Sequence, residues 1–268
     1  FIHAGSADEI VFTKSATEAI NLVAAGISQS LEPGDEIVIS EMEHHANLIP
    51  WQQLAARTGA ELKWFEVTPE GRLDLSAINS IITENTKVVA LTHQSNVLGT
   101  INPLEAITAR AHEVGAVVVL DACQSVPHMP IDVKKLNVDF LAFSGHKALG
   151  PTGVGVLWSS VFEELPPFLF GGSMIETVTM TSATWAPAPR KFEAGVPNMA
   201  QAVGLGAALN YLTKIGMEKI YRHEELLTER ALKGLQDISG VEIIGSKSSL
   251  NRGSAISFTL EGVHPHDV

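Results

Sequence analysis

Short apolar runs alternate with stretches of helical periodicity over roughly the first 150 residues of the chain. Helical patterns cover residues 17–31 and 45–59, between the first runs. The runs are rich in β-branched residues without strict alternation, which is typical of strands buried on both faces. They occupy residues 9–12, 35–40, 61–67, 87–93, 116–122, 139–144 and 154–158. Strands that alternate with helices predict βαβ units and a mostly parallel sheet.

The pattern changes at about residue 200. Residues 201–235 have the periodicity of one or two long helices, and residues 240–245 and 254–260 then resemble strands. We therefore expect an α/β large domain over residues 1–210, followed by the start of a smaller α+β domain over 211–268. The chain begins with Phe rather than Met and breaks off after EGVHPHDV, so we interpret it as a fragment.

Composition narrows the possible partners. The 268 residues carry a formal net charge of -12 and contain no basic block, so we expect no nucleic-acid partner. No window contains the roughly 18 unbroken apolar residues that a membrane span requires, so we expect no membrane partner. The single cysteine, Cys123, cannot form an internal disulfide and fits a reducing, cytoplasmic compartment. A targeting segment ahead of Phe1 is left open.

Polar residues follow five of the predicted strands. In open parallel sheets, ligands bind at the carboxyl ends of the strands. We therefore expect these polar residues to converge on one ligand site. They are Ser15-Ala16-Thr17, Glu43-His44-His45, Gln94-Ser95-Asn96, Asp121-Ala122-Cys123-Gln124 and Ser144-Gly145-His146-Lys147.

The first of these segments has the form of a capping box. Ser15 stands three residues before Glu18, directly ahead of an apolar helical pattern. A capped helix start offers free N–H groups and a positive dipole end, which suit a phosphate. A well-capped helix without a ligand is the alternative interpretation.

Lys147 and Asp121 have the character of cofactor ligands. A lysine that follows a buried strand can bond covalently to an aldehyde cofactor, and its neighbours Ser144 and His146 can donate to a phosphate. A surface lysine is the alternative. Asp121 ends the apolar run AVVVL, and a carboxylate near the core needs a cation or several donors. A protonated pyridine nitrogen is such a cation. A helix or turn cap is the alternative role.

The histidine pairs and the cysteine carry weaker signals. His44 and His45 lack the partner spacing of a metal site, so we expect no metal there and favour stacking on a cofactor and proton transfer. His264 and His266 suggest a polar turn. Cys123 is expected to be a small core residue whose burial keeps it unreactive.

Six segments together resemble the cysteine desulfurase and selenocysteine lyase family, with the SUF-type branch as the nearest match. They are SATEAINLV, EMEHHANLIPW, THQSNVLGT, DACQSVPHMPIDV, FSGHKALGPTGVG and RKFEAGVPN. The family consists of fold-type I enzymes that use pyridoxal 5'-phosphate (PLP) and are related to the class V aminotransferases. The resemblance covers essentially the whole chain. It implies that residues 1–210 form the PLP-binding large domain.

The resemblance also implies residue roles. Lys147 would hold PLP covalently, and His44 would stack on its ring and move protons. Asp121 would pair with the pyridine nitrogen, and Gln124 with the phenolic oxygen. The remaining contacts would come from Ala16, Thr17, Ser144 and His146 at the phosphate, Asn96 at cofactor and substrate, and Thr184 at the phosphate of a partner subunit in a homodimer.

The implied reaction removes sulfur from L-cysteine, giving L-alanine and an enzyme persulfide, and the sulfur passes to an acceptor protein for iron–sulfur cluster assembly. The same resemblance implies L-selenocysteine as a second substrate. Two departures stand out: Ala16 replaces a common threonine, and Cys123 replaces a common small residue. We also expect the family's nucleophilic cysteine and substrate-binding arginine to lie beyond Val268. The alternatives are another class V aminotransferase or epimerase, which EHHAN disfavours, and a non-catalytic module that binds PLP or a partner protein.

Overall fold

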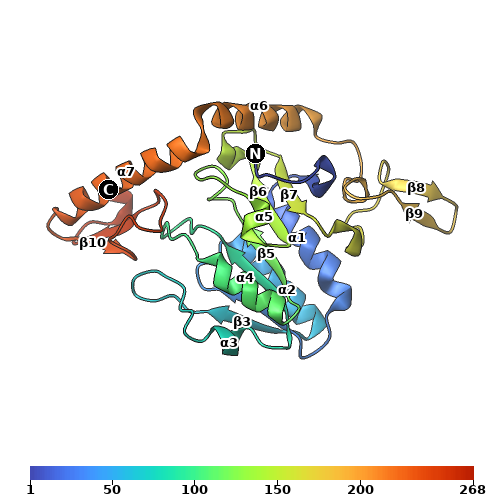
Figure 1. The fold of residues 1–268 in the computed structure, drawn as a ribbon, viewed down its shortest axis with the longest axis horizontal. Helices are drawn as coiled ribbons and strands as arrows, with labels where there is room; N and C mark the ends of the chain where they lie inside the picture. The colour runs from blue at the N-terminus through green and yellow to red at the C-terminus, as the bar shows by residue number, and fades with distance from the viewer.

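The computed structural model describes residues 1–268 and is built around a seven-stranded sheet (Figure 1). The strand order is β1-β7-β6-β5-β4-β2-β3. Strands β2, β3, β4, β5 and β6 run parallel, and β7 is antiparallel to both β6 and β1. The prediction of a mostly parallel sheet is therefore confirmed. The strands are β1 (Ile10–Thr13), β2 (Glu36–Ser40), β3 (Glu61–Phe65), β4 (Thr86–Thr92), β5 (Val117–Asp121), β6 (Phe140–Ser144) and β7 (Gly155–Ser159).

Helices cover both faces of this sheet. Helices α1 (Ala16–Ile27) and α2 (Ile49–Thr58) bury their apolar sides on one face. Helix α4 (Leu104–Glu113) covers the other face, with the short helices α3 (Ile78–Ile81) and α5 (Val133–Leu136). Successive strand residues pack on opposite sides, because side chains alternate along a strand. In β2, for example, Val38 joins the α4 side while Ile37 and Ile39 join the α1 side.

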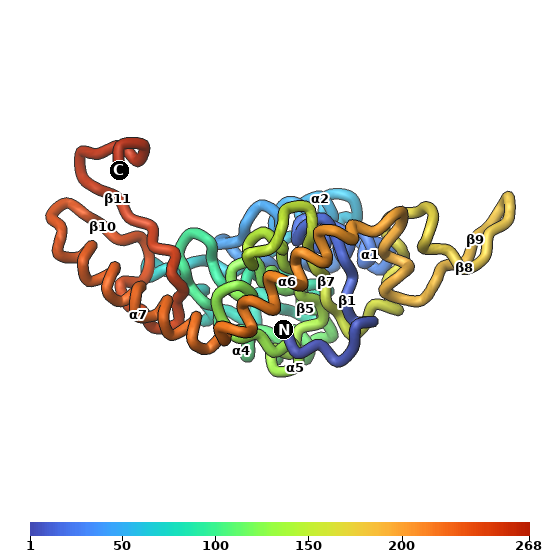
Figure 2. The backbone as a smooth tube through the Cα atoms, turned by 90° about the horizontal axis from the view of Figure 1, so that it is seen from above, coloured from blue at the N-terminus to red at the C-terminus, as the bar shows by residue number.

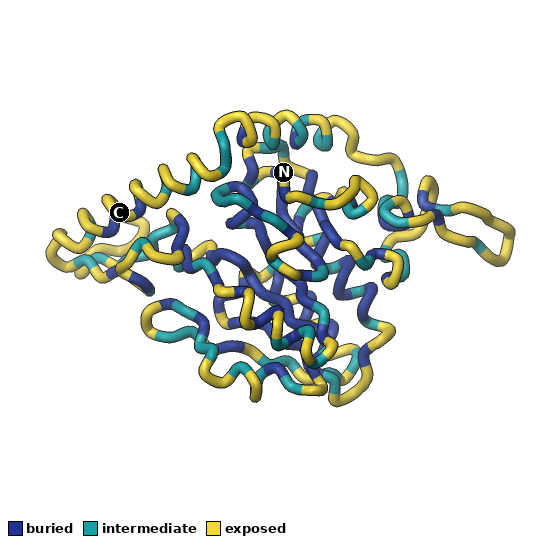
Figure 3. The backbone as a smooth tube through the Cα atoms, in the orientation of Figure 1, coloured by how far each residue is buried: buried dark blue, intermediate teal, exposed yellow.

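The last part of the chain is much more exposed than the sheet (Figure 3). Helices α6 (Met199–Ile215) and α7 (Met217–Gln236) are followed by the hairpin β10 (Val241–Ile244) and β11 (Ser257–Leu260). These agree with the expected helices and strands. The expected domain boundary at residue 210 falls within α6, and the division into two domains stays a prediction.

A second hairpin, β8 (Ile175–Val178) and β9 (Ala183–Trp185), was not predicted from the sequence pattern. It projects from one end of the molecule, while α7, β10 and β11 lie at the other end (Figure 2). Most of its residues are exposed, so it forms an arm without a core of its own. None of the helices combines the length and the apolar character that a membrane span requires.

Candidate functional site

The five predicted polar segments lie at one edge of the sheet. Strands β2, β4, β5 and β6 are parallel, and β1 has the same direction because both β1 and β6 are antiparallel to β7. Their carboxyl ends therefore meet at a common edge, where ligands of open α/β sheets bind. The topology thus brings the start of α1 close to the ends of β5 and β6, as the individual contacts confirm.

Helix α1 begins next to the end of β6. The Ala16 N–H donates to Ser144 Oγ at 2.9 Å, which joins residues 128 positions apart. This approach requires Gly155 in β7, because a Cβ there would lie 2.6 Å from the backbone of Ser15. Ser144 Oγ also lies 3.9 Å from Cys123 Sγ as an acceptor. Since it accepts both contacts, the Ser144 hydroxyl hydrogen is free to donate to a ligand.

The predicted capping box is wrong in its details. Ser15 is the N-cap of α1, but its side chain makes no capping hydrogen bond. Glu18 accepts a hydrogen bond at 2.5 Å from the N–H of Lys14, one residue before the N-cap. Because the Ser15 hydroxyl makes no capping bond, the N–H groups in the first turn of α1 do not have it as an acceptor. The helix start therefore keeps donor capacity for an anion.

Asp121 is a buried carboxylate with one free oxygen. Its side chain lies at the end of β5 and the residue is 4 % exposed. Oδ1 accepts from the Cys123 N–H at 2.9 Å, and this is the one hydrogen bond that the protein makes to the Asp121 carboxylate. Burial raises the pKa of the Cys123 thiol well above its usual range, and the charge of Asp121 adds to that rise. The thiol therefore stays protonated, and Asp121 is available to a cation.

Lys147 lies half-buried on the 3-10 helix η4 (Gly145–Ala148), directly after β6. It takes part in none of the ion pairs of the structure. Its charge acts on Cys123 by lowering that thiol's pKa, against the larger effect of burial, so Lys147 faces the same edge of the sheet. A Cβ at Gly145 would lie 2.8 Å from Val154 Cγ1, so the tight turn before the lysine requires glycine.

His44 and Asn96 line a common cavity of about 450 Å³ between the ends of β2 and β4. Both residues are exposed. His44 Nδ1 accepts from the Ala46 N–H at 3.0 Å, so a neutral ring carries its hydrogen on Nε2. The cavity is lined by Glu41, Met42, Glu43, His44, His45, Val67, Ser95, Asn96, Val97 and Leu98.

The loop that carries Asn96 is held by the C-terminal part of the chain. Arg252 is 2 % exposed and donates to the carbonyl oxygens of Leu98 at 2.9 Å and Ala255 at 2.6 Å. The Gly253 N–H donates to Gly99 O at 2.7 Å. The position of Asn96 therefore depends on residues more than 150 positions later.

Sequence reasoning placed Glu43 at this edge of the sheet but gave it no role. Its carboxylate is buried beside His44 and accepts from Ser40 Oγ at 2.5 Å, Asn47 Nδ2 at 2.6 Å and the Thr92 N–H at 2.9 Å. Burial raises its pKa to about 8, and the nearby charge of Asp121 also raises it. A signal was present in the sequence, since Glu43 stands next to His44 after a buried strand, but its partners come from separate segments.

The other predicted residues are less tightly tied to this edge. Thr17 and His146 are exposed, and Gln124 is half-buried without a hydrogen bond to the protein. Thr184 lies on the β8–β9 arm, away from the other candidate residues, and its Oγ1 is 2.6 Å from Thr177 Oγ1. The roles of all these residues stay predictions.

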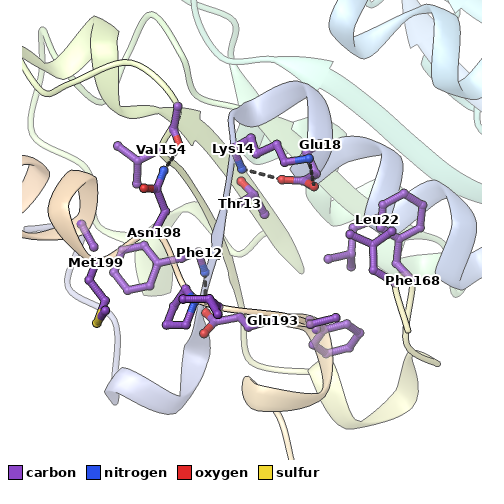
Figure 4. Close-up of a pocket in the computed structure, with 17 residues that line it drawn as sticks. Phe12, Thr13, Lys14, Glu18, Leu22, Val154, Phe168, Glu193, Asn198 and Met199 are labelled. Atoms are coloured by element: carbon purple, nitrogen blue, oxygen red, sulfur yellow. Dashed lines mark hydrogen bonds and ion pairs between the residues drawn. The ribbon is translucent and has the colours of Figure 1, made fainter. Parts of the chain in front are cut away.

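A second cavity of about 450 Å³ lies beside the β1–α1 turn (Figure 4). It is mostly apolar, with Glu193 accepting from the Phe12 N–H at 2.7 Å and Asn198 donating to Gly153 O at 2.6 Å. None of the predicted cofactor ligands lines it. No group of three or more His, Cys, Asp or Glu side chains is arranged to hold a metal ion.

The donor set at the sheet edge suits a ligand with three chemically different ends. The start of α1 and the Ser144 hydroxyl offer donors to an anion. Asp121 Oδ2 offers an acceptor to a cationic N–H, and Lys147 offers an amine without an ionic partner. A phosphorylated pyridine aldehyde has these three features, so the residues present fit PLP.

Comparisons with known proteins agree with this chemistry. The family model "Aminotransferase class-V" matches residues 1–268. The probable cysteine desulfurase of Streptomyces coelicolor is 58 % identical over 275 residues, which cover 100 % of this chain and 66 % of that protein. The apo structure of a cysteine desulfurase from Thermococcus onnurineus superposes with a TM-score of 0.93 at 42 % identity, covering 97 % of this chain and 65 % of that one.

A more distant solved structure contains the cofactor itself. It is a mutant of C-DES with glycine covalently linked to PLP, and it matches with a TM-score of 0.85 at 27 % identity over 97 % of this chain and 69 % of that one. The expected family resemblance and fold are therefore confirmed. The chain spans 62–66 % of the length of the first three curated relatives.

Proposed function

Because the chain belongs to the class V aminotransferase family, we propose that it is the PLP-binding part of a cysteine desulfurase. The single observation that carries the proposal is the convergence of Lys147, Asp121, Ser144 and the start of α1 at one sheet edge. The names of the similar proteins support the choice of reaction.

Each end of the site has its own task in this proposal. Lys147 Nζ would hold the cofactor covalently, and Asp121 Oδ2 would keep a hydrogen on the pyridine nitrogen. Gln124 binds the phenolic oxygen. The phosphate is held by the Ser144 hydroxyl, Thr17, His146 and the first-turn amides at Ala16, where the helix dipole favours negative charge.

PLP, when bound, supplies an electron sink that stabilises negative charge at the substrate Cα. His44 would stack on the ring, and its neutral form carries the hydrogen on Nε2, since Nδ1 accepts from the Ala46 N–H. It therefore transfers protons through Nε2 during substrate conversion. Asn96, which lines the same cavity, would bind both the cofactor and the substrate carboxylate.

The overall reaction converts L-cysteine and a protein thiol into L-alanine and a protein persulfide. The substrate carbon–sulfur bond breaks, a sulfur–sulfur bond forms, and the thiol hydrogen balances the new C–H bond of alanine. Cys123 is unsuited as that thiol, because it is buried and its pKa is raised. The persulfide is therefore carried by a cysteine that this chain does not contain.

The same proposal extends to the partner subunit, the sulfur acceptor, the second substrate and the cellular compartment. Thr184, on the exposed arm, binds the phosphate at the neighbouring subunit of a homodimer. The persulfide sulfur passes to an acceptor protein for iron–sulfur cluster assembly, and L-selenocysteine is a second substrate. The single cysteine supports a reducing compartment, such as the cytoplasm.

Borohydride trapping tests the cofactor assignment. The purified chain is mixed with PLP, reduced, digested and examined by mass spectrometry, and the pyridoxyl group should appear on Lys147. Lys147→Ala should abolish trapping. Lys14→Ala is the matched control, because Lys14 is an exposed lysine near the same helix start, with its side chain 82 % exposed. Retention of the label in Lys147→Ala, or its presence on Lys14, contradicts the assignment.

A further inference from the structure

Two glutamates flank strand β2 and differ sharply in their surroundings. Glu36 opens the strand, is 5 % exposed, and accepts from Thr83, Thr86 and Lys63, whose Nζ lies 2.5 Å away. Glu43 follows the strand, is 9 % exposed, and also has three donors, but no cation contacts it. A buried carboxylate without a cation is costly in its ionised form.

The surroundings of Glu43 add negative rather than positive charge. Asp121, at the end of the neighbouring β5, raises the pKa of Glu43 further, after the larger effect of burial. His93, after β4, is buried and neutral because burial lowers its pKa to about 4. Glu41, His44 and His45 line the same cavity as Glu43 and are exposed to solvent. No group that packs against Glu43 offers a compensating cation.

Glu43 joins four segments through its hydrogen bonds. Ser40 ends β2, and the Thr92 N–H ends β4. Asn47 closes the 3-10 helix η3 (His45–Asn47), and its Oδ1 accepts from Trp51 Nε1 in α2 at 2.9 Å. His44 lies between Glu43 and η3. The backbone from which His44 projects is thus fixed at both sides by one carboxyl group.

We propose that Glu43 is a positioning residue that works as a neutral carboxylic acid: it ties β2, β4, η3 and α2 together beneath His44, and it leaves Asp121 as the only buried negative charge at this edge of the sheet. In the neutral acid the Ser40 contact is reversed: Glu43 donates its hydrogen to Ser40 Oγ, 2.5 Å away, and Asn47 Nδ2 and the Thr92 N–H remain the donors to Glu43. Deprotonation would place a second buried anion beside Asp121 and loosen the turn that holds His44. The part that concerns His44 and Asp121 rests on the proposed function.

The protonation state can be read from Trp51 in the chain without cofactor. Trp51 is fully buried and reaches Glu43 through Asn47. Its indole N–H resonance, identified among the four tryptophans with Trp51→Phe, should titrate with a midpoint near 8. Glu43→Gln keeps two of the three hydrogen bonds and cannot ionise, so its Trp51 resonance should not move.

Glu36→Gln is the matched control. It removes a buried carboxylate from the other end of the same strand, where Lys63 keeps that group ionised. The Trp51 titration should persist in this variant, even though it loses stability. A Trp51 resonance that stays constant between about pH 6 and 9.5 in the unmodified chain overturns the proposal, and that measurement remains valid if Glu43→Gln does not fold.

The positioning role is tested with PLP bound. The PLP affinity of the unmodified chain should fall above about pH 8, as Glu43 ionises, whereas that of Glu43→Gln should stay within about threefold over the same range. Glu43→Ala leaves buried donors unpaired and should weaken PLP binding about tenfold at pH 7. An alkaline loss of affinity that persists in Glu43→Gln overturns the role. Complete failure of PLP to bind to the unmodified chain contradicts the proposed function instead, and leaves the Trp51 titration as an independent result.

Discussion

Gly155→Ala should disturb the candidate phosphate site without replacing any predicted cofactor ligand. Gly155 opens β7 and pairs with Thr13 at the end of β1. An added Cβ would lie 2.6 Å from both the Cα and the carbonyl carbon of Ser15. Both are backbone atoms, so no flexible side chain can yield. The start of α1 has to move away from the sheet.

The size of the effect follows from these distances. Ordinary contact begins at 3.4 Å, so the turn has to retreat by about 0.8 Å. If this displacement lengthens the bond from Ala16 N to Ser144 Oγ, it increases from 2.9 Å to about 3.7 Å, beyond hydrogen-bonding range. Overpacking costs about 1–3 kcal/mol of folding free energy. The lost bond, worth about 0.5–1.5 kcal/mol, should weaken PLP binding by roughly 2- to 12-fold.

Urea unfolding and a PLP absorbance titration measure the two effects. Gly206→Ala is the matched control, because Gly206 lies within helix α6 and a Cβ there meets nothing within 4 Å. The control should stabilise the chain by about 1 kcal/mol and leave PLP affinity unchanged. If Gly155→Ala has the stability and PLP affinity of the unmodified chain, the close approach does not hold the site together, and the reasoning is refuted.

Three further predictions concern the titration of Glu43, the reactivity of the Cys123 thiol and the role of the Asp121 carboxylate. The neutral form of Glu43 contributes stability that is fully present below about pH 4.5 and is lost as the pH rises through about 8, at about 1.4 kcal/mol per pH unit. Buried His93 contributes stability with the opposite pH dependence, between about pH 4 and 6.5. The free energy of unfolding in urea should therefore be compared between the unmodified chain and Glu43→Gln at each pH. Parallel curves of stability against pH contradict the prediction. Cys123 should resist alkylation in the folded chain, and the 268 residues should release almost no sulfide from L-cysteine; robust release that Cys123→Ser abolishes would overturn this. Asp121→Asn should still bind PLP but slow the exchange of the substrate Cα hydrogen with deuterated water by orders of magnitude, and an unchanged exchange rate would count against the pyridinium contact.

The strands and their polar ends could be predicted because they depend on local pattern. Residues 116–122 form a continuous apolar run because β5 lies in the middle of the sheet and is covered on both faces. Asp121 is then placed at the ligand edge by strand direction alone. The strand order could not be predicted, since nothing in residues 10–13 shows that they pair with residues 155–158.

The features that sequence reasoning missed depend on distant contacts or on the absence of a core. The carboxyl group of Glu43 is buried by partners at residues 40, 47 and 92, and its lack of a cation is visible only in three dimensions. The capping box failed because Glu18 accepts from the N–H of Lys14 rather than from that of Ser15, and the Ser15 side chain makes no capping bond. The β8–β9 arm was not predicted because most of its residues are exposed to solvent. Strands without a buried face need no alternation of apolar and polar residues, so the sequence carries no strand pattern there.

The pairing of β1 with β7 also sets the order in which the site can be assembled during synthesis. Ile10 in β1 pairs with Trp158 in β7, whereas Glu36 in β2 pairs with Glu61 in β3. The pairing of β1 therefore closes a much longer segment of chain than the pairing of β2. At about 5–20 residues per second, a ribosome needs roughly 7–30 seconds to make the residues between Ile10 and Trp158. For that time β1 has no strand to join, and the amide of Ala16 has no Ser144 hydroxyl to bind for most of it. The nascent chain therefore exposes β1 as an unpaired strand during this time, and the anion-binding corner is completed only after β6 and β7 have emerged.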